Sequence, residues 1–231
     1  MNDLASRHRI LSDAQRKAEQ LFIEIEVQNL IRPGVTERQV NEEIYALAYE
    51  MFGIKKYWHK RIVRAGKNTL CPYRENPPVL QINADDIAFL DLGPIFEDWE
   101  ADFGRTYVLG SDPLKLKARD DIEAAWGLGK KYFDSVFGIT GSQLYEYMCS
   151  LAVRYGWIYG GPHAGHLIGE FPHEQIQGDE VQNYIHPDNH QRMRDPDVHG
   201  KPRDWILEVH FVDRVRELGG FFEQLLTCDP N

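Results

Sequence analysis

An internal repeat constrains the fold of this sequence more than any other feature. The segment Gly34–Val40 is echoed by Gly138–Leu144 at an offset of 104 residues, and Gly, Thr and Gln are identical in the two copies. A long helical pattern precedes each copy, so the order of elements matches as well. The repeat predicts two related halves, about residues 5–110 and 113–228, within one domain of residues 1–231. The alternative is a chance similarity between two amphipathic helices that begin alike.

Each copy of the repeat is expected to open a helix. Thr36 and Gln39 have the spacing of a capping box, in which each side chain binds the backbone N–H of the other residue, and the second copy keeps both residue types. The helical patterns that precede the copies run over about residues 3–31 and 113–135. Pro33, followed by Gly, is expected to end the first of them.

Composition limits the classes of partner and compartment. A net charge of -10 would repel phosphate backbones and anionic lipid, so neither nucleic acid nor a membrane is an expected partner. No stretch approaches the roughly 20 apolar residues of a membrane span, and the N-terminus lacks the apolar core of a signal peptide. The widely separated Cys71, Cys149 and Cys228 read as small hydrophobes rather than ligands. We therefore expect a cytoplasmic protein.

Two carboxylates interrupt apolar strands in the first half. Asp91 lies in a run expected to form a strand over residues 86–92, and Asp102 lies in a second strand expected over residues 99–109. Burying an unpaired carboxylate costs several kcal/mol, so each needs a strong partner such as a cation. A hairpin centred between Phe96 and Glu97 would place the two aspartates directly opposite each other.

The second half repeats this arrangement with glutamates. Glu208 lies in a strand expected over residues 205–213, and Glu223 in one expected over residues 219–227. A hairpin centred after Val215 would pair them. The four carboxylates would then converge where the halves meet, an oxygen-rich set that suits a pair of divalent ions.

A histidine-rich segment adds nitrogen to this set. His163, His166 and His173 fall within the glycine-containing stretch 162–174. One histidine alone is more often structural, but three close together, beside four strand carboxylates, favour a ligand.

These residues together resemble the pita-bread metallopeptidases, the family of methionine aminopeptidases, prolidases and aminopeptidase P. Gly165-His166-x-Ile168-Gly169 followed by His173-Glu174 is similar to that family's histidine segment, and residues 101–110 resemble the Asp-x-x-Arg-Thr strand of its proline-specific members. The resemblance covers nearly the whole chain. It implies an α+β pita-bread fold, with two pseudo-symmetric halves of antiparallel strands covered by helices. It also implies two divalent metal ions (Mn, Co, Zn or Fe) held by five side chains: Asp91, Asp102, His166, Glu208 and Glu223.

The sequence departs from the family pattern around the ligands. Family peptidases usually carry a further histidine in the loop before the first aspartate, where this chain reads Leu70–Arg74, and Tyr73 is the nearest polar candidate. After Glu208 the family usually has Pro, and this chain has Val209. Two residues after Asp102 the family commonly has Thr, and this chain has Gly104. Before the last glutamate prolidases often have Arg, and this chain has Phe222. The ligands are intact, so these changes bear on substrate choice.

The resemblance also implies the catalytic roles. Glu208 would act as general base in metal-assisted hydrolysis and pass the proton to the leaving amine. His173 would donate a hydrogen bond to the substrate carbonyl or the tetrahedral intermediate; for His163 this role and a purely structural one stay open. Arg105 is expected to be a structural ion-pair partner.

The expected reaction is hydrolysis of the N-terminal peptide bond of a short peptide, with Xaa-Pro favoured. Activity like that of a methionine aminopeptidase, and a non-peptidase or slow member that keeps the metal site, are the alternatives. The polar stretch 175–204 reads either as a solvated insertion or as a lid or dimer contact that shapes the peptide pocket. A homodimer is therefore possible on sequence grounds.

Overall fold

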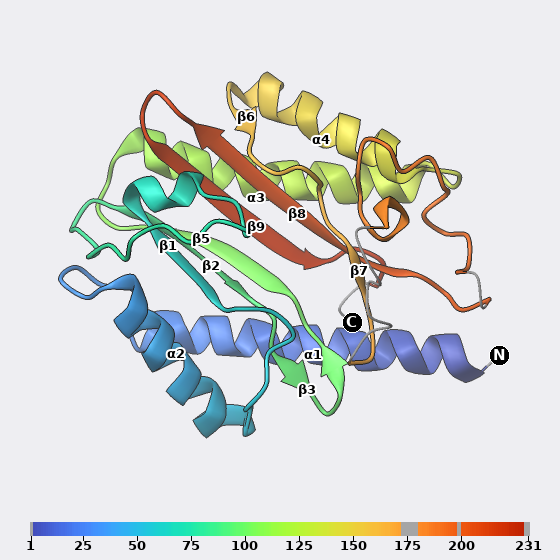
Figure 1. The fold of residues 1–231 in the computed structure, drawn as a ribbon, viewed down its shortest axis with the longest axis horizontal. Coiled ribbons are helices and arrows are strands. Elements are labelled where there is room, and N and C mark those ends of the chain that lie inside the picture. The colour runs from blue at the N-terminus through green and yellow to red at the C-terminus, as the bar shows by residue number, and fades with distance from the viewer. Residues whose placement is uncertain (1, 172–179, 198–199, 229–231) are drawn as a thin grey trace.

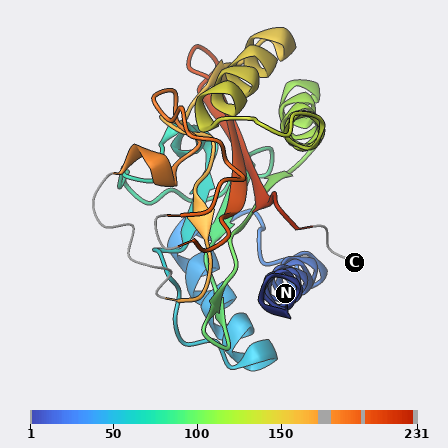
Figure 2. The ribbon, with the colours of Figure 1, turned by 90° about the vertical axis from the view of Figure 1, so that its right-hand side faces the viewer.

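The computed structural model describes residues 2–171, 180–197 and 200–228, and most of its strands form one seven-stranded antiparallel sheet. Figure 2 shows α1 and α3 on the same side of the sheet, with loops on the other. The α+β arrangement expected from the sequence is therefore confirmed. Within these described ranges, no helix combines the length and apolar character needed to cross a membrane. The helices are α1 Asn2–Val27, α2 Glu37–Phe52, α3 Pro113–Ser135 and α4 Gly141–Tyr155, with short 3-10 turns η1 Gly66–Leu70 and η2 Val181–Asn183.

The helix starts are as the sequence predicts. Thr36 caps α2 and Thr140 caps α4, each through a complete capping box with the Gln three residues on. The end of α1 differs from the prediction, because the helix stops at Val27 rather than near Ile31. Asn29 there adopts a positive φ of 50°, a conformation that Asn tolerates and that closes a helix before any proline is reached.

The sheet joins the two halves of the chain edge to edge (Figure 1). Its order is β1 (Ile62–Ala65), β2 (Ile87–Leu92), β5 (Phe103–Val108), β9 (Leu218–Leu225), β8 (Asp204–Asp213) and β6 (Ile158–Tyr159), with β7 (Leu167–Ile168) also paired to β8. A separate small hairpin consists of β3 (Ile95–Phe96) and β4 (Trp99–Glu100). The first half meets the second at β5 and β9, where Gly104 pairs with Glu223.

Side chains alternate between two different environments across this sheet. Leu90 of β2 and Leu207 of β8 are fully buried in apolar clusters on the helix side, where the indole of Trp126 in α3 donates to the Leu207 carbonyl at 3.0 Å. Their neighbours Asp91 and Glu208 line a cavity instead. Because successive residues of a strand point to opposite faces, the carboxylates lie on the face away from α3.

The hairpin of the second half has the predicted register, and that of the first half does not. Glu208 pairs with Glu223, as a turn centred after Val215 requires. Asp91 pairs with Gly104 rather than with Asp102.

The turn itself explains the shift in the first half. The centre lies between Glu97 and Asp98, one residue later than predicted, and both residues have positive φ values of 50° and 72°. A two-residue turn of this kind matches the twist of the flanking strands, but it is usually made by Asn and Gly, so two acidic residues gave no signal for it.

The polar stretch before β8 has three buried residues in the part that is described. Ile185 is completely buried and Met193 is 1% exposed. Asn189 is also buried, and its carbonyl accepts from Ser142 at the start of α4. The loop composition hid a few apolar residues that pack onto the second half.

Candidate active site

Four strands bring three of the predicted ligands into one row across the sheet. The pairing runs from Asp91 on β2 to Gly104 on β5, then to Glu223 on β9 and Glu208 on β8. Directly paired residues point to the same face, so the three carboxylates project together. Asp102 precedes Gly104 by two residues. It completes the cluster, because its carboxylate lies within 3.1 Å of the His166 ring that also faces the glutamates.

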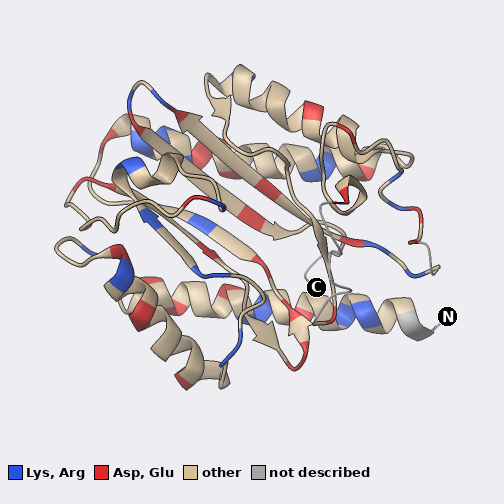
Figure 3. Ribbon diagram, viewed as in Figure 1, with Lys and Arg blue, Asp and Glu red and all other residues tan. Residues whose placement is uncertain are grey.

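Gly104 leaves space in the middle of this row. A Cβ atom built there would lie 2.6 Å from the ring of Phe221 and 3.2 Å from Glu223 Cβ. The Phe221 ring thus occupies the space that a side chain at position 104 would need. This contact accounts for glycine at a position where the family commonly has Thr. Figure 3 shows acidic positions on the central strands of the sheet.

His166 faces the carboxylates from the segment that precedes β7. Its Nε2 lies 3.1 Å from Asp102 Oδ2, 3.6 Å from Glu208 Oε1 and 3.8 Å from Glu223 Oε1. Its Nδ1–H donates to the Leu167 carbonyl at 2.7 Å, which leaves Nε2 to face the cluster. Gly165 allows this approach, because it adopts a φ of 134° and a Cβ there would lie 2.0 Å from the Ile206 carbonyl oxygen.

The cluster carries more negative charge than its protein neighbours balance. Burial raises the pKa of Glu208 and of Glu223, and further carboxylates nearby raise both pKa values again. Burial also raises the pKa of Asp91, whereas burial of Asp102 is outweighed by two adjacent histidines that hold its pKa low. For His166, burial lowers the pKa, but Asp102 and Glu208 outweigh it and raise the value to about 9.

These residues fit divalent metal ions. Asp91 Oδ1 and Glu223 Oε2 are buried and have no hydrogen-bond partner among the described residues. Such atoms are costly unless a cation reaches them. Two groups offer three ligand atoms within 4.8 Å of one another, and they share Asp102: one is His59, Asp91 and Asp102, and the other is Asp102, His166 and Glu223.

His59 in the first of these groups was missed by sequence reasoning. Its Nε2 lies 3.2 Å from Asp102 Oδ1 and 3.4 Å from Asp91 Oδ1, and its side chain is only 6% exposed. Its position gave a usable signal, because it follows the capped helix of the first half as His163 and His166 follow that of the second. His59 does not lie in the loop 70–74, where the family pattern predicts a histidine.

A cavity of about 280 Å³ opens over the carboxylates. His163 lines it, with Nδ1 at 3.7 Å from Glu208 Oε1 and without a hydrogen-bond partner. Burial lowers the pKa of His163 to about 3, so the ring is neutral at physiological pH. Tyr184, from the polar stretch, packs against this ring at 4.8 Å between centroids and lines the cavity too. The stretch thus contributes to the pocket wall.

The remaining predicted residues lie in different settings. His173 falls outside the described residues. Tyr73 lines the cavity with 48% of its surface exposed, and its ring lies 5.7 Å from that of His59. Arg105 makes no ion pair with any of the described residues: its guanidinium stacks between the rings of Phe103 and Phe222 and donates to the Glu223 carbonyl.

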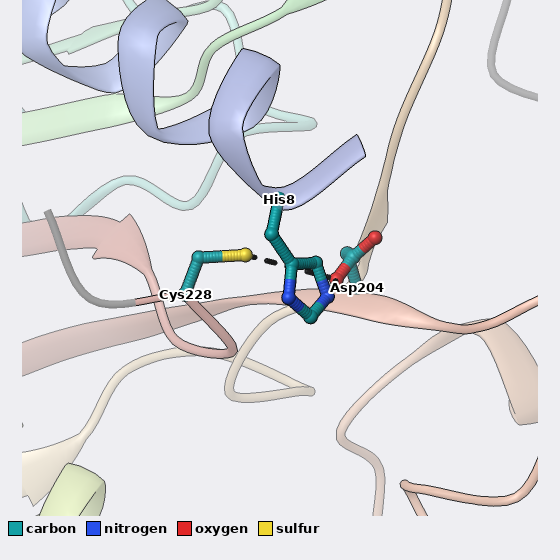
Figure 4. A group of neighbouring side chains, drawn as sticks. All are labelled: His8, Asp204 and Cys228. Atoms are coloured by element: carbon teal, nitrogen blue, oxygen red, sulfur yellow. Dashed lines mark hydrogen bonds and ion pairs between the residues drawn. The ribbon is translucent and has the colours of Figure 1, made fainter. Parts of the chain in front are cut away.

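A third group of side chains that could hold a metal lies elsewhere and consists of His8, Asp204 and Cys228 (Figure 4). His8 Nε2 lies 3.1 Å from Asp204 Oδ1, and the Cys228 thiol faces the same oxygen. Asp204 is fully buried, but Arg7 already pairs with its other oxygen. Burial raises the pKa of the Cys228 thiol to about 12, which disfavours the thiolate that a metal needs. This group reads as an ion-pair anchor for α1.

Sequence comparison places the chain among peptidases that use metal. The profile of metallopeptidase family M24 matches residues 9–199. The Xaa-Pro dipeptidase of Lactobacillus helveticus is 28% identical over 161 residues, which are 65% of this chain and 42% of that protein. The chain thus matches less than half the length of this relative.

Comparison with solved structures shows the pita-bread fold. A prolidase from Thermococcus sibiricus superposes with a TM-score of 0.75 at 19% identity, over 95% of this chain and 55% of that one. A methionine aminopeptidase from Thermotoga maritima superposes with a TM-score of 0.70 at 15% identity, over 98% of this chain and 94% of that one. The fold expected from the sequence is confirmed.

Proposed function

Because this chain belongs to metallopeptidase family M24, we propose that it is a dinuclear metal-dependent peptidase that hydrolyses the N-terminal peptide bond of short peptides, with Xaa-Pro bonds favoured. One observation carries the proposal: buried carboxylates from both halves of the sheet converge with His166 at the floor of a cavity. Two of the buried carboxylate oxygens lack a hydrogen-bond partner among the described residues, and a bound cation would offset the cost of burying them.

The ions would be held by the residues of this cluster. The proposed ligands are Asp91, Asp102, His166, Glu208 and Glu223. Mn²⁺, Co²⁺, Zn²⁺ and Fe²⁺ all accept such a set of carboxylate and imidazole ligands. When bound, two such ions supply Lewis-acid polarisation of the scissile carbonyl and a water of lowered pKa.

Glu208 is proposed to move the proton. Burial raises its pKa toward the neutral range, so it can accept a proton from the attacking water and release it to the leaving amine. Neutral His163, whose Nδ1 lies 3.7 Å from Glu208 Oε1, would donate a hydrogen bond to the substrate carbonyl oxygen. His173 keeps the same proposed role on the strength of the family resemblance.

Substrate preference rests on two kinds of support. The strand from Asp102 to Thr106 follows the pattern of proline-specific family members, and the relative from Lactobacillus helveticus is an Xaa-Pro dipeptidase. The cavity wall includes the rings of Trp58 and Phe221, which suit an apolar residue such as proline or methionine. Activity on N-terminal methionine is therefore the second candidate. The third candidate is a slow or non-peptidase metalloprotein. It is supported by the lack of a histidine in the loop where the family usually has one, since the nearest polar residue there is the half-exposed Tyr73.

An activity panel separates these candidates. The protein is dialysed against chelator, reloaded with Mn²⁺, Co²⁺ or Zn²⁺, and assayed on Xaa-Pro dipeptides, matched dipeptides without proline, and peptides with N-terminal methionine. The proposal expects metal-dependent release from Xaa-Pro substrates above the other two classes. Turnover of methionine peptides alone would favour the second candidate, and metal binding without turnover the third.

Compartment and assembly are further proposals. Cys71, Cys149 and Cys228 are all unpaired, as is usual in a reducing compartment, and we propose a cytoplasmic location on that ground. We also propose a homodimer in which the polar stretch before β8 forms the contact. Light scattering of the purified protein measures the assembly directly.

A further inference from the structure

We propose that His59 is a sixth metal-binding side chain, which gives the ion held by Asp91 and Asp102 a nitrogen ligand of its own. The inference rests on the proposed metal site, and it assigns a role to a residue outside the five-ligand set that the family resemblance implies. Four independent features of the described residues support it.

The first feature is the hydrogen bond that orients the ring of His59, which is the same as in His166. The Nδ1–H of His59 donates to the carbonyl of the next residue, Lys60, at 2.7 Å. His166 donates in the same way to the carbonyl of Leu167, also at 2.7 Å. A hydrogen bond of this kind fixes the ring and presents Nε2 as the free ligand atom, as is usual for histidines that bind metal.

The second feature is where the two Nε2 atoms point. His59 Nε2 lies 3.2 Å from Oδ1 of Asp102, and His166 Nε2 lies 3.1 Å from Oδ2 of the same carboxylate. One histidine thus faces each oxygen of the shared aspartate. Asp91 Oδ1, which lies 3.4 Å from His59 Nε2, is buried and makes no hydrogen bond within the part of the chain that the structure describes. An ion between these atoms would satisfy it.

The third feature is the space made for the ring. A Cβ atom on Gly93 would lie 2.2 Å from His59 Cδ2 and 2.4 Å from Trp58 Nε1. Gly93 follows Asp91 by two residues, where β2 has ended and the hairpin departs from regular pairing. Only glycine at this position lets the ring lie against the first aspartate.

The fourth feature is the support behind the ring. The Trp58 backbone N–H donates to the Gly93 carbonyl at 3.0 Å, and its indole donates to the Ala101 carbonyl at 3.3 Å. The same indole packs edge-on against both histidines, with centroids 4.4 Å from His59 and 5.0 Å from His166. Trp58 is therefore hydrogen-bonded to the hairpin on both sides of the region where regular pairing stops. These bonds hold the neighbouring His59 in place before any ion binds.

A second imidazole changes the metal preference of the site. Carboxylate oxygen suits Mn²⁺, whereas imidazole suits Zn²⁺ and Fe²⁺, and affinity for nitrogen-containing sites rises from Mn²⁺ toward Zn²⁺. His59 should therefore strengthen Zn²⁺ binding more than Mn²⁺ binding. Replacement of the ring by an amide should reduce the difference between the two metals.

Calorimetric titration of chelator-treated protein with Zn²⁺ and with Mn²⁺ tests the inference. We expect two ions per chain in the unchanged protein. We expect the affinity of one Zn²⁺ site to fall by about 10–100-fold or more in His59→Gln, with a smaller loss for Mn²⁺. The control is His210→Gln, which removes another buried histidine of the same cavity, one that bonds to the Thr69 carbonyl and to none of the four carboxylates. Its two affinities should stay unchanged.

Two further measurements test the inference if His59→Gln fails to fold. Gly93→Ala retains His59 but pushes its ring away, and should weaken the same Zn²⁺ site. X-ray absorption of the unchanged zinc-loaded protein needs no variant: two ions that share His59 and His166 give an average of about one imidazole per zinc, and His166 alone gives about half.

The outcomes separate this inference from the proposed function. If the unchanged protein binds no divalent ion, both are overturned. If it binds two ions, but His59→Gln keeps both Zn²⁺ affinities or the zinc-loaded protein shows about half an imidazole per zinc, the metal site stands and the role of His59 is overturned.

Discussion

The two hairpins that carry the carboxylates reach the same result by different means. In the second half, β8 and β9 pair without interruption, and Glu208 lies directly opposite Glu223. In the first half, regular pairing stops at Leu92 and Phe103, and Asp102 lies just beyond the end of the ladder. A continuous ladder positions two ligands by itself, whereas the interrupted one leaves a gap at Gly93 that a loop with Trp58 and His59 fills.

This difference teaches that the two sides of the metal site are built to different rules. On the glutamate side, the β8–β9 ladder continues on both sides of the Glu208–Glu223 pair. The aspartate side relies on side chains from another segment, so it can accept an additional ligand.

Glu208→Gln tests the chemistry on the regular hairpin. The amide keeps an oxygen of nearly the same shape but cannot accept the proton, so hydrolysis of the best substrate should fall by about 10²–10⁴-fold in kcat. Metal content measured by mass spectrometry should fall far less than activity. A variant that keeps full activity would remove Glu208 from the role of base.

His173→Ala tests a residue of the second half that has no predicted equivalent in the first. If it donates a hydrogen bond to the developing oxyanion, kcat should fall by about 10²–10³-fold while metal content stays unchanged. His163→Ala is the matched comparison, because His163 lies beside Glu208 in the cavity. Equal, small losses in both variants would argue that neither histidine contacts the reacting carbonyl.

Metal removal tests whether the ions link the two hairpins. Facing carboxylates repel without an ion, so chelator should lower the melting temperature. At a metal concentration of 100 times the Kd, binding stabilises by about 2.7 kcal/mol. That corresponds to a shift of several degrees for a domain of this size, at roughly 2–4 °C per kcal/mol. A melting curve that chelator leaves unchanged would contradict a shared metal site.

The turn of the interrupted hairpin gives the smallest effect. Glu97 and Asp98 both hold positive φ values, which Asn and Gly adopt at lower cost. Replacement of the pair by Asn-Gly should raise stability by about 1 kcal/mol, measured by urea unfolding. Asp85→Asn, an exposed change outside the turn, serves as the control and should have little effect. A loss of stability would mean that the acidic pair makes contacts that favour the turn.

The sequence predicted the regular parts of this molecule well. The capping boxes at Thr36 and Thr140 and the pairing of Glu208 with Glu223 follow from local patterns, and each is confirmed. These features depend on residues close together in the chain or on uninterrupted alternation. Local information was therefore sufficient for them.

The parts that failed depend on distant contacts. The first hairpin was placed one residue early because its turn residues lack the usual chemistry. His59 was missed because its partners, Asp91 and Asp102, lie more than 30 residues away and only the fold brings them together. The buried contacts of Ile185 were hidden by the polar residues around it.

The anchor of α1 bears on the order in which the molecule assembles. Arg7 meets Asp204 across a separation of 197 residues, and Gln15 accepts from the backbone N–H of Leu225 across 210. Closing loops of that length costs entropy and slows folding. Helix α1 can therefore complete these contacts only after β8 and β9 are in place. We expect α1 to dock late, and its amide protons to gain protection from exchange after those of the central strands in refolding experiments.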